Sequence, residues 1–239
     1  MADARAPRSF VGTSGFAYAS WRPAFYPPKT KPAEMLAFYA SVFRSVEINY
    51  TFNRFPSATV MASWRRQTPE GFRFALKAPA EITHKKRLKE AGPTLASFAT
   101  RVGELGDKCG PILLQLPPNM KADPPRLDAV LSALPHGTEA AVEFRHESWF
   151  TDEVYALLER RRTALCIAES DDLATPCLAT APYGYLRLRR PGYTETDLAV
   201  WADRIRGESR WKRVYAYVKH DEAGVAPDLA RKLTELLSS

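Results

Sequence analysis

The chain of 239 residues has no apolar run that approaches the roughly 20 residues needed to span a bilayer, which argues against a membrane protein. Residues 1–8 read MADARAPR and no hydrophobic segment follows them, so they lack the pattern of a signal peptide. The three cysteines, Cys109, Cys166 and Cys177, are odd in number and form no Cys-x-x-Cys pair, which fits a reducing cytoplasm and argues against a structural zinc site. We therefore expect a cytoplasmic protein that does not contact membranes and whose residues 1–8 form a flexible tail.

Three motifs of familiar enzyme classes are also missing. The sequence has no His-Glu-x-x-His, no Gly-x-Ser-x-Gly and no Gly-x-Gly-x-x-Gly, and the stretch 12–15 (GTSG) lacks the spacing of the last. His84, His146 and His220 lie far apart in sequence, so we predict no set of metal ligands. The adjacent acids at 171–172 could bind a divalent cation, although such pairs usually cap a helix, and the cofactor therefore stays open.

Charge and composition indicate the kind of partner. Lysine and arginine number 34 against 27 acidic residues, which gives a net charge of +7 and a pI near 9.4. This excess favours an anionic partner, either a small molecule such as phosphate or an acidic metabolite, or a nucleic acid. A solvated arginine-rich surface explains the same charge without a ligand. Composition also leaves the oligomeric state open.

Strand and helix patterns alternate along the whole chain. Residues 112–116 form a continuous apolar run, as expected of a strand buried on both faces in a parallel sheet. The segment 151–153 (TDE) opens a helix with a capping threonine and two acids in its first turn. The eight expected strands are residues 10–14, 45–49, 72–77, 112–116, 141–146, 164–169, 183–189 and 214–220.

This alternation predicts an α/β fold class. Strands that alternate regularly with helices imply a parallel sheet with helices outside it. Eight such units in a chain of this length, without a linker or a change of composition, predict a single domain over residues 1–239, a closed (β/α)8 TIM-type barrel. The competing fold is an open doubly wound sheet, which the missing dinucleotide-binding turn disfavours. We expect the aromatic loop 16–26 to cover the rim of the barrel, with stacking on sugars or bases as the alternative.

The stretch 141–149 (AVEFRHESW) places charged side chains at the end of an apolar strand. Val142 and Phe144 face one side of the strand, whereas Glu143 and Arg145 face the other. In folds built from βα repeats, charged groups at the carboxyl ends of strands are where the chemistry occurs. A buried ion pair between neighbouring strands is the plainer interpretation, and this stretch alone does not separate the two.

In a barrel, the carboxyl ends of all strands meet on one face. Burying an ion costs several kcal/mol unless it is paired, so the many charged residues expected there indicate a site. Glu47 and Glu143 are the candidate catalytic acid/base pair, and Glu169 ends a further strand. The candidate substrate-binding residues are Asn49, Lys77, His84, Gln115, Arg145, Arg187, Lys219 and His220.

Members of this group also have structural alternatives. Gln115 suits a structural hydrogen bond, and one of Arg187 and Arg189 could simply neutralise Glu143 or Glu169. Two carboxylates in one pocket tend to separate their pKa values, which leaves one acid and one base near neutrality. The surrounding cations oppose this separation. If the cations dominate, both glutamates stay ionised and serve as ligands or scaffold.

Several motifs in order along the chain resemble the YecE-like family, also described as domain of unknown function 72. They are GTSGF at 12–16 with Trp21 and FYP at 25–27, VEIN at 46–49 with TF at 51–52 and Pro56, KA at 77–78 with ITH at 82–84, LQLPP at 114–118, and VEFRH at 142–146 with Trp149. The resemblance implies a TIM-type barrel and leaves the biochemical role unsettled. The chain departs from the family at 187–190 (RLRR), where Arg-x-His-Gly is common, and at 217–220 (YVKH), where Tyr-Phe-x-Asn is common. These departures indicate a more cationic mouth.

Two functions from different classes fit these observations. The first is a barrel enzyme, hydrolase- or phosphodiesterase-like or isomerase-like, that acts on a phosphorylated or other anionic substrate, a nucleic-acid phosphodiester included. In that case Glu47 and Glu143 exchange protons, and Lys77 and Arg145 are the leading anion ligands. The second is a non-catalytic protein that binds an anionic ligand or nucleic acid through the same basic mouth.

Overall fold

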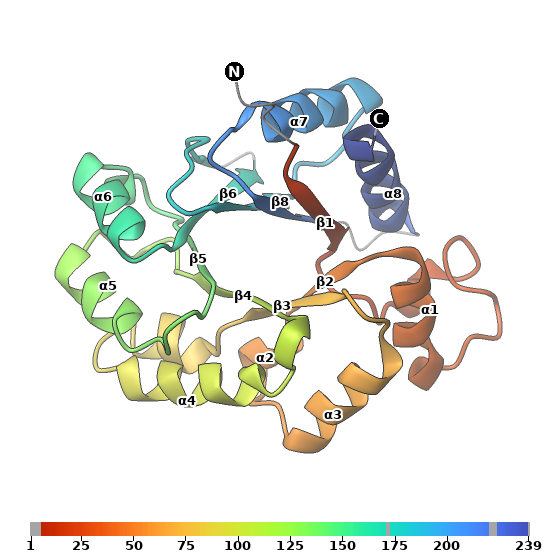
Figure 1. Cartoon of the computed structure of the whole chain (residues 1–239), viewed down its shortest axis with the longest axis horizontal. Helices are drawn as coiled ribbons and strands as arrows, with labels where there is room; N and C mark the ends of the chain where they lie inside the picture. The colour runs from red at the N-terminus through yellow and green to blue at the C-terminus, as the bar shows by residue number, and fades with distance from the viewer. Residues whose placement is uncertain (1–5, 171–172, 220–223, 239) are drawn as a thin grey trace.

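The computed structural model describes residues 6–170, 173–219 and 224–238. Eight parallel strands form a nearly closed barrel with the helices outside it (Figure 1). Neighbouring strands follow the order β1-β9-β8-β6-β5-β4-β3-β2. This arrangement confirms the (β/α)8 TIM-type barrel. The strands are β1 (Arg8–Thr13), β2 (Ser45–Ile48), β3 (Arg73–Lys77), β4 (Cys109–Gln115), β5 (Ala140–Glu143), β6 (Ala164–Ser170), β8 (Tyr183–Leu188) and β9 (Arg213–Val218).

The barrel closes where β1 approaches β2. A parallel bridge joins Ser14 to Glu47 at the carboxyl ends of the two strands. Further down, Gly12 lies so close to β2 that a Cβ atom would overlap the carbonyl oxygen of Ser45 and lie 2.8 Å from the hydroxyl of Tyr39. A glycine is therefore required here by the close approach of the two backbones.

Amphipathic helices cover the outside of the barrel. In α6 the side chain of Thr151 accepts a hydrogen bond from the backbone N–H of Val154, while Val154, Leu157 and Leu158 are buried, as the sequence predicts. None of the helices in the described ranges is long and apolar enough to cross a membrane. The main helices are α1 (Met35–Val42), α3 (Ala58–Gln67), α4 (Gly92–Gly103), α5 (Pro124–Leu131), α6 (Asp152–Arg160), α7 (Glu195–Gly207) and α8 (Val225–Ser238).

Apolar side chains fill two regions. The larger lies between the strands and the surrounding helices and includes Leu114, Val142 and Leu186. The smaller uses the alternate strand positions, which face the barrel axis, and combines small residues such as Ala75 and Ala141 with tyrosines. The tyrosines of this inner cluster, all on β8 and β9, are Tyr183, Tyr185, Tyr215 and Tyr217. They fill the lower barrel, so the polar strand ends rest on a packed interior.

Strand β5 ends at Glu143, three residues before the expected end at His146. The chain turns here because the ring of Phe144 stacks on that of Trp149, with 4.7 Å between centroids, in the outer core. The indole N–H of Trp149 also donates to the carbonyl of Met120 at 2.7 Å. The residues that follow Glu143 therefore leave the β-sheet and border the opening of the barrel at the carboxyl ends of the strands, here called the mouth.

Some short elements carry no periodic pattern and were not expected from the sequence. They are α2 (Tyr50–Asn53), the π-helical turn η3 (Glu81–Lys85) and β7 (Leu173–Ala174), which pairs antiparallel with β6. At the N-terminus, Arg8 is not part of a tail, because it pairs with Arg213 as the first residue of β1.

The aromatic loop packs inward. Trp21, Phe25 and Tyr26 are buried, and Phe25 contacts the rings of Phe38 and Tyr39 on α1. Buried rings of this kind are not available to stack on a sugar or a base. They join the loop to the outer core instead.

Candidate functional site

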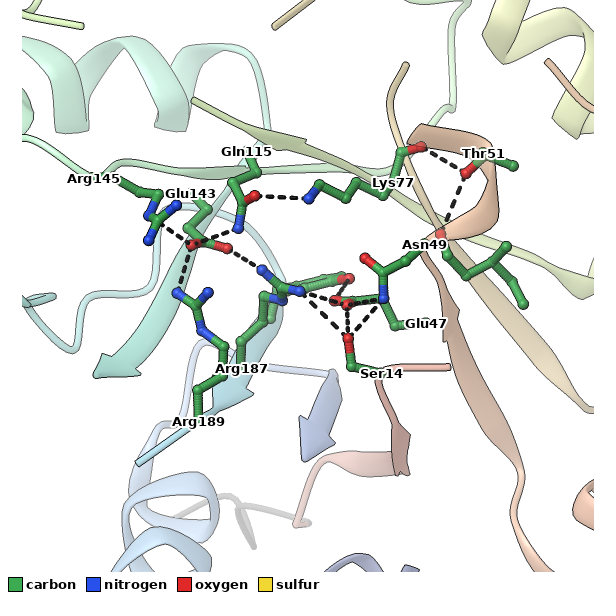
Figure 2. A network of polar contacts seen from close by, with 12 residues as sticks. Ser14, Glu47, Asn49, Thr51, Lys77, Gln115, Glu143, Arg145, Arg187 and Arg189 are labelled. Atoms are coloured by element: carbon green, nitrogen blue, oxygen red, sulfur yellow. Dashed lines mark hydrogen bonds and ion pairs between the residues drawn. The ribbon is translucent and has the colours of Figure 1, made fainter. Parts of the chain in front are cut away.

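A polar network occupies the carboxyl ends of the strands (Figure 2). Each member is the last residue of its strand or stands one position from it, at an alternate residue that faces the barrel axis. The sequence places such residues on six strands, and the barrel brings their side chains together. The members are Ser14 after β1, Glu47 on β2, Lys77 on β3, Gln115 on β4, Glu143 on β5 and Arg187 on β8.

Arg187 lies at the centre and bridges the two candidate catalytic carboxylates. Its NH1 donates to Glu143 Oε2 at 2.5 Å and its NH2 donates to Glu47 Oε1 at 2.8 Å. The side chain of Arg187 is only 3% exposed and both glutamates are fully buried. Buried charges of this kind persist only when each is paired and hydrogen-bonded.

Glu47 has further donors on both oxygens. The Ser14 hydroxyl donates to Oε1 at 2.5 Å, and the Tyr185 hydroxyl donates to Oε2 at 2.8 Å. The amide of Asn49 donates to Ser14 Oγ at 2.8 Å and to Glu47 Oε1 at 3.3 Å. Burial alone raises the pKa of Glu47, but the charge of Arg187 and these hydrogen bonds outweigh it, so the pKa is lower than its usual 4.5.

Glu143 is held in the same way. Arg189 NH2 donates to Oε1 at 2.6 Å, and Gln115 Nε2 donates to the same oxygen at 2.9 Å. Burial opposes the ionised form, but Arg187 and Arg189 lower the pKa of Glu143 from 4.5 to about 2. The lowered pKa values of both glutamates favour the arrangement in which the cations dominate and both carboxylates stay ionised.

Lys77 differs from the arginines because its partner is neutral. Its Nζ donates to Gln115 Oε1 at 2.7 Å and lies 4.0 Å from the centre of the Phe52 ring. The hydroxyl of Thr51 donates to the carbonyl of Lys77 at 2.7 Å, which joins α2 to the end of β3. Burial, together with the charge of Arg187, lowers the pKa of Lys77 to about 8.

Two more cations border this network. Arg145 has a side chain that is 37% exposed, and its Nε lies 4.0 Å from Glu143 Oε1, which is too long for a hydrogen bond. Lys219 follows β9 and is exposed, and its charge contributes to the lowered pKa of Lys77. Neither cation donates a hydrogen bond to a carboxylate among the described residues.

His84 lies in η3 beside this group. Its ring packs edge-on against Phe52, with 4.9 Å between centroids, and its Nδ1 is 2.9 Å from the hydroxyl of Thr83. Burial and the charges of Lys77 and Arg145 lower the pKa of His84. The other candidate histidine, His220, lies outside the described residues.

One strand-end residue points away from the group that the sequence suggested. Glu169 accepts hydrogen bonds from the Tyr193 hydroxyl at 2.5 Å and from Trp201 Nε1 at 2.8 Å, both outside the barrel. The reason is the two-residue period of β6, since the inner cluster takes Cys166 and Ala168 and leaves Glu169 on the other face.

The structure also adds two members that were not candidates, Ser14 and Tyr185, and it confirms Arg189 as a partner of Glu143, one of the structural alternatives. Ser14 and Tyr185 both donate to Glu47. Tyr185 precedes Arg187 by two residues and so shares its face, a signal that the sequence contained. Among the described residues, no three His, Cys, Asp or Glu side chains gather into a possible metal site. The acidic pair at 171–172 lies outside the described residues.

The fold and this network define a TIM-type barrel protein with charged side chains grouped at the carboxyl ends of its strands. The chain belongs to the family described as protein of unknown function DUF72, whose model matches residues 10–239. The resemblance noted in the sequence is thereby confirmed.

Relatives and solved structures agree with this assignment. The chain is 36% identical over 113 residues to the UPF0759 protein YecE of Escherichia coli K12, covering 47% of this chain and 42% of YecE. It is 28% identical over 141 residues to the UPF0759 protein YunF of Bacillus subtilis, covering 55% of this chain and 50% of YunF. The matches thus span about half the length of these relatives.

Two crystal structures share the fold. A DUF72 family protein of Thermotoga maritima superposes with a TM-score of 0.83 at 26% identity, covering 97% of this chain and all of that one (100%). A DUF72 family protein of Enterococcus faecalis superposes with a TM-score of 0.81 at 16% identity, covering 97% and 96%.

Proposed function

We propose that the mouth of the barrel binds a small anionic substrate and that the protein is an enzyme acting on it. The observation that carries this proposal is the excess of cations over available carboxylates. Every oxygen of Glu47 and Glu143 already accepts a hydrogen bond. Among the described residues, none of Lys77, Arg145 and Lys219 donates a hydrogen bond to these carboxylates, and only Arg145, at 4.0 Å from Glu143, forms an ion pair with one.

The cations take different roles in this proposal. Arg145 and Lys219 hold the anion, because both are accessible and neither is paired by hydrogen bonds to an acid in the described chain. Arg187 positions the two glutamates, which remain ionised as fixed counter-charges instead of exchanging protons. Proton exchange near neutrality falls to Lys77, whose pKa is about 8. Asn49 and His84, both partly exposed, supply neutral hydrogen-bonding groups at the edge, and Gln115 joins Lys77 to Glu143 beneath them.

Titration calorimetry with inorganic phosphate tests the anion site. Arg145→Ala should weaken binding by about 1–3 kcal/mol, the usual contribution of a charge-assisted hydrogen bond. The control is Arg66→Ala, which removes the same charge from an exposed residue in the last turn of α3. Equal affinities for the two variants and the wild type would contradict the proposal.

A second candidate is a nucleic-acid phosphodiester as the ligand. It is favoured by a basic run that begins at the last residue of η3, in which Lys85, Lys86 and Lys89 are exposed and the charge of Arg87 lowers the pKa of His84. For this ligand, oligonucleotide affinity should fall steeply with salt, since each phosphate contact releases a counterion. A charge-reversed run, with Lys85 and Lys86 replaced by Glu, should abolish that dependence while leaving phosphate binding intact.

A turnover assay distinguishes an enzyme from a non-catalytic binding protein. A panel of phosphate esters can be screened for released phosphate, with Lys77→Arg as the comparison. Turnover that this variant loses while it still binds phosphate supports an enzyme. Phosphate binding without turnover of any ester in the panel favours the binding protein.

A further inference from the structure

We propose that Lys77 is a nucleophile that forms a Schiff base with the carbonyl group of an anionic substrate. The inference rests on the proposed anion site, and it names the class of compound that the site takes: an aldehyde or ketone that also carries a carboxylate or a phosphate. Lys77 meets three structural conditions for this chemistry.

The first condition is an amine without a counter-ion. The carboxylates nearest to Lys77 are Glu47 and Glu143, and their oxygens are occupied by Arg187, Arg189 and neutral donors. Among the described residues, the ammonium group of Lys77 forms no ion pair with either carboxylate and donates to Gln115 instead, and burial disfavours its charged form further. The lowered pKa of about 8 agrees with this geometry. Near pH 7.5 about a quarter of such a lysine is neutral, against about a thousandth of an ordinary one.

The second condition is a defined direction for the lone pair. Gln115 donates its Nε2–H to Glu143, and this fixes its Oε1 toward Lys77 as an acceptor. An N–H of Lys77 must point at Gln115, and the Phe52 ring lies 4.0 Å away. In the neutral amine, this hydrogen bond holds one N–H on Gln115 and leaves the lone pair free of that contact.

The third condition is a nearby anion site. Lys77 donates to Gln115 at 2.7 Å, Gln115 donates to Glu143 Oε1 at 2.9 Å, and Arg145 Nε lies 4.0 Å from the same oxygen. The charge of Lys219, which follows β9, also lowers the pKa of Lys77. When Arg145 and Lys219 hold the carboxylate or phosphate of a substrate, the carbonyl group of the same substrate is brought to Lys77.

The step balances without a further reactant. The nitrogen lone pair of Lys77 adds to the carbonyl carbon and gives a carbinolamine. Nitrogen then forms a double bond to this carbon, and the carbonyl oxygen leaves as water, whose two hydrogens are the two that the amine has lost. No group is oxidised or reduced.

Lys108 offers an internal control in the same chain. Burial also lowers its pKa, but it follows α4, before β4 begins, and donates to the carbonyls of Arg65 and Thr68 at the opposite end of the barrel. It has a perturbed amine without the anion site. A reaction that depended on pKa alone would label both lysines.

Reductive trapping of the full chain tests the inference. The protein is incubated with glyoxylate and sodium cyanoborohydride, and the carboxymethylated lysines are mapped by peptide mass spectrometry. Glycolaldehyde, a neutral aldehyde of similar size, is the matched probe. With glyoxylate we expect at least about tenfold more adduct on Lys77 than on Lys108. Arg145→Ala should lower the Lys77 adduct about tenfold with glyoxylate and leave it unchanged with glycolaldehyde.

The outcomes separate this inference from the proposed function. Adduct on Lys77 no greater than on Lys108, in a protein that binds phosphate through Arg145, overturns the Schiff base and leaves the anion site standing. Adduct on Lys77 that is equal for glyoxylate and glycolaldehyde overturns the anionic class of substrate. Absence of both phosphate binding and selective trapping overturns the two proposals together.

Discussion

The guanidinium of Arg187 supports both buried glutamates, so its removal should be costly in a predictable way. Arg187→Met keeps the apolar stem and removes the donors at 2.5 Å from Glu143 and 2.8 Å from Glu47. Breaking a buried ion pair by deleting one partner costs about 3–5 kcal/mol, because the other charge stays buried. Glu143 retains Arg189, whereas Glu47 retains only neutral donors. We therefore expect a loss of about 4 kcal/mol at pH 7, mostly from Glu47.

The pH dependence of stability should have the opposite sign in Arg187→Met. In the wild type the pKa of Glu143 is lowered from 4.5 to about 2, so its stabilisation is complete above pH 4.5 and is lost as the pH falls toward 2. That difference corresponds to about 3 kcal/mol, since one pKa unit is worth about 1.36 kcal/mol. In the variant, Glu47 is buried without a cation and burial raises its pKa. The stability of Arg187→Met should therefore increase between pH 7 and pH 5, where that of the wild type is nearly constant.

Urea unfolding followed by tryptophan fluorescence at several pH values measures both effects. Arg66→Met is the exposed control and should stay within about 0.5 kcal/mol of the wild type. If Arg187→Met does not fold, the double variant with Glu47→Gln should fold, because the uncompensated charge is gone. A loss below about 1 kcal/mol with a wild-type pH profile would refute the reasoning, since water and not Arg187 would then balance the carboxylates.

Three further predictions follow from single positions. Sulfate, which keeps its charge in this range, should bind more weakly as the pH rises through about 8, and Lys77→Met should remove this step in calorimetric titrations because the ammonium form of Lys77 attracts the anion. Gly12→Ala should cost about 3 kcal/mol or more in urea unfolding, because its Cβ overlaps a carbonyl of β2, whereas Gly103→Ala in α4 meets no atom within 4 Å and should be neutral or stabilising. Thr151→Ala should cost about 1 kcal/mol by removing the cap of α6, and Thr151→Ser should restore it.

The fold could be predicted because its signals are local. A largely apolar strand such as residues 112–116, a capped amphipathic helix and a two-residue period each act over a few residues, and eight repetitions fix the architecture. The same period places Glu47, Glu143 and Arg187 on the inner face. It fails at Glu169, because β6 is apolar on both faces and small inner residues such as Cys166 and Ala168 give no sign of which face is inner.

The pairing within the site could not be predicted, because it joins distant parts of the chain. Arg187 and Glu47 are 140 residues apart, and their contact depends on the register of β8 and on closure between β1 and β2. Arg189 was one of two arginines that could neutralise a glutamate, and only the barrel geometry shows that both bind Glu143. Ser14 carries no charge and stands outside any familiar motif, so its role depends wholly on its neighbours.

These pairings decide which side chain can exchange a proton. A carboxylate that accepts from arginine and from neutral donors at both oxygens holds its charge to low pH, so the two acids that looked catalytic in the sequence become fixed counter-charges. A lysine that donates to an amide oxygen and forms no ion pair within the described chain lacks the stabilisation that a carboxylate would give its ammonium form. Arg187 contributes to both effects: its charge keeps Glu47 and Glu143 ionised by lowering their pKa values, and it also lowers the pKa of Lys77. The arginine that fixes the acids therefore also prepares Lys77 to act as a base or nucleophile, and its substitution should raise the pKa of Lys77 while it destabilises the glutamates.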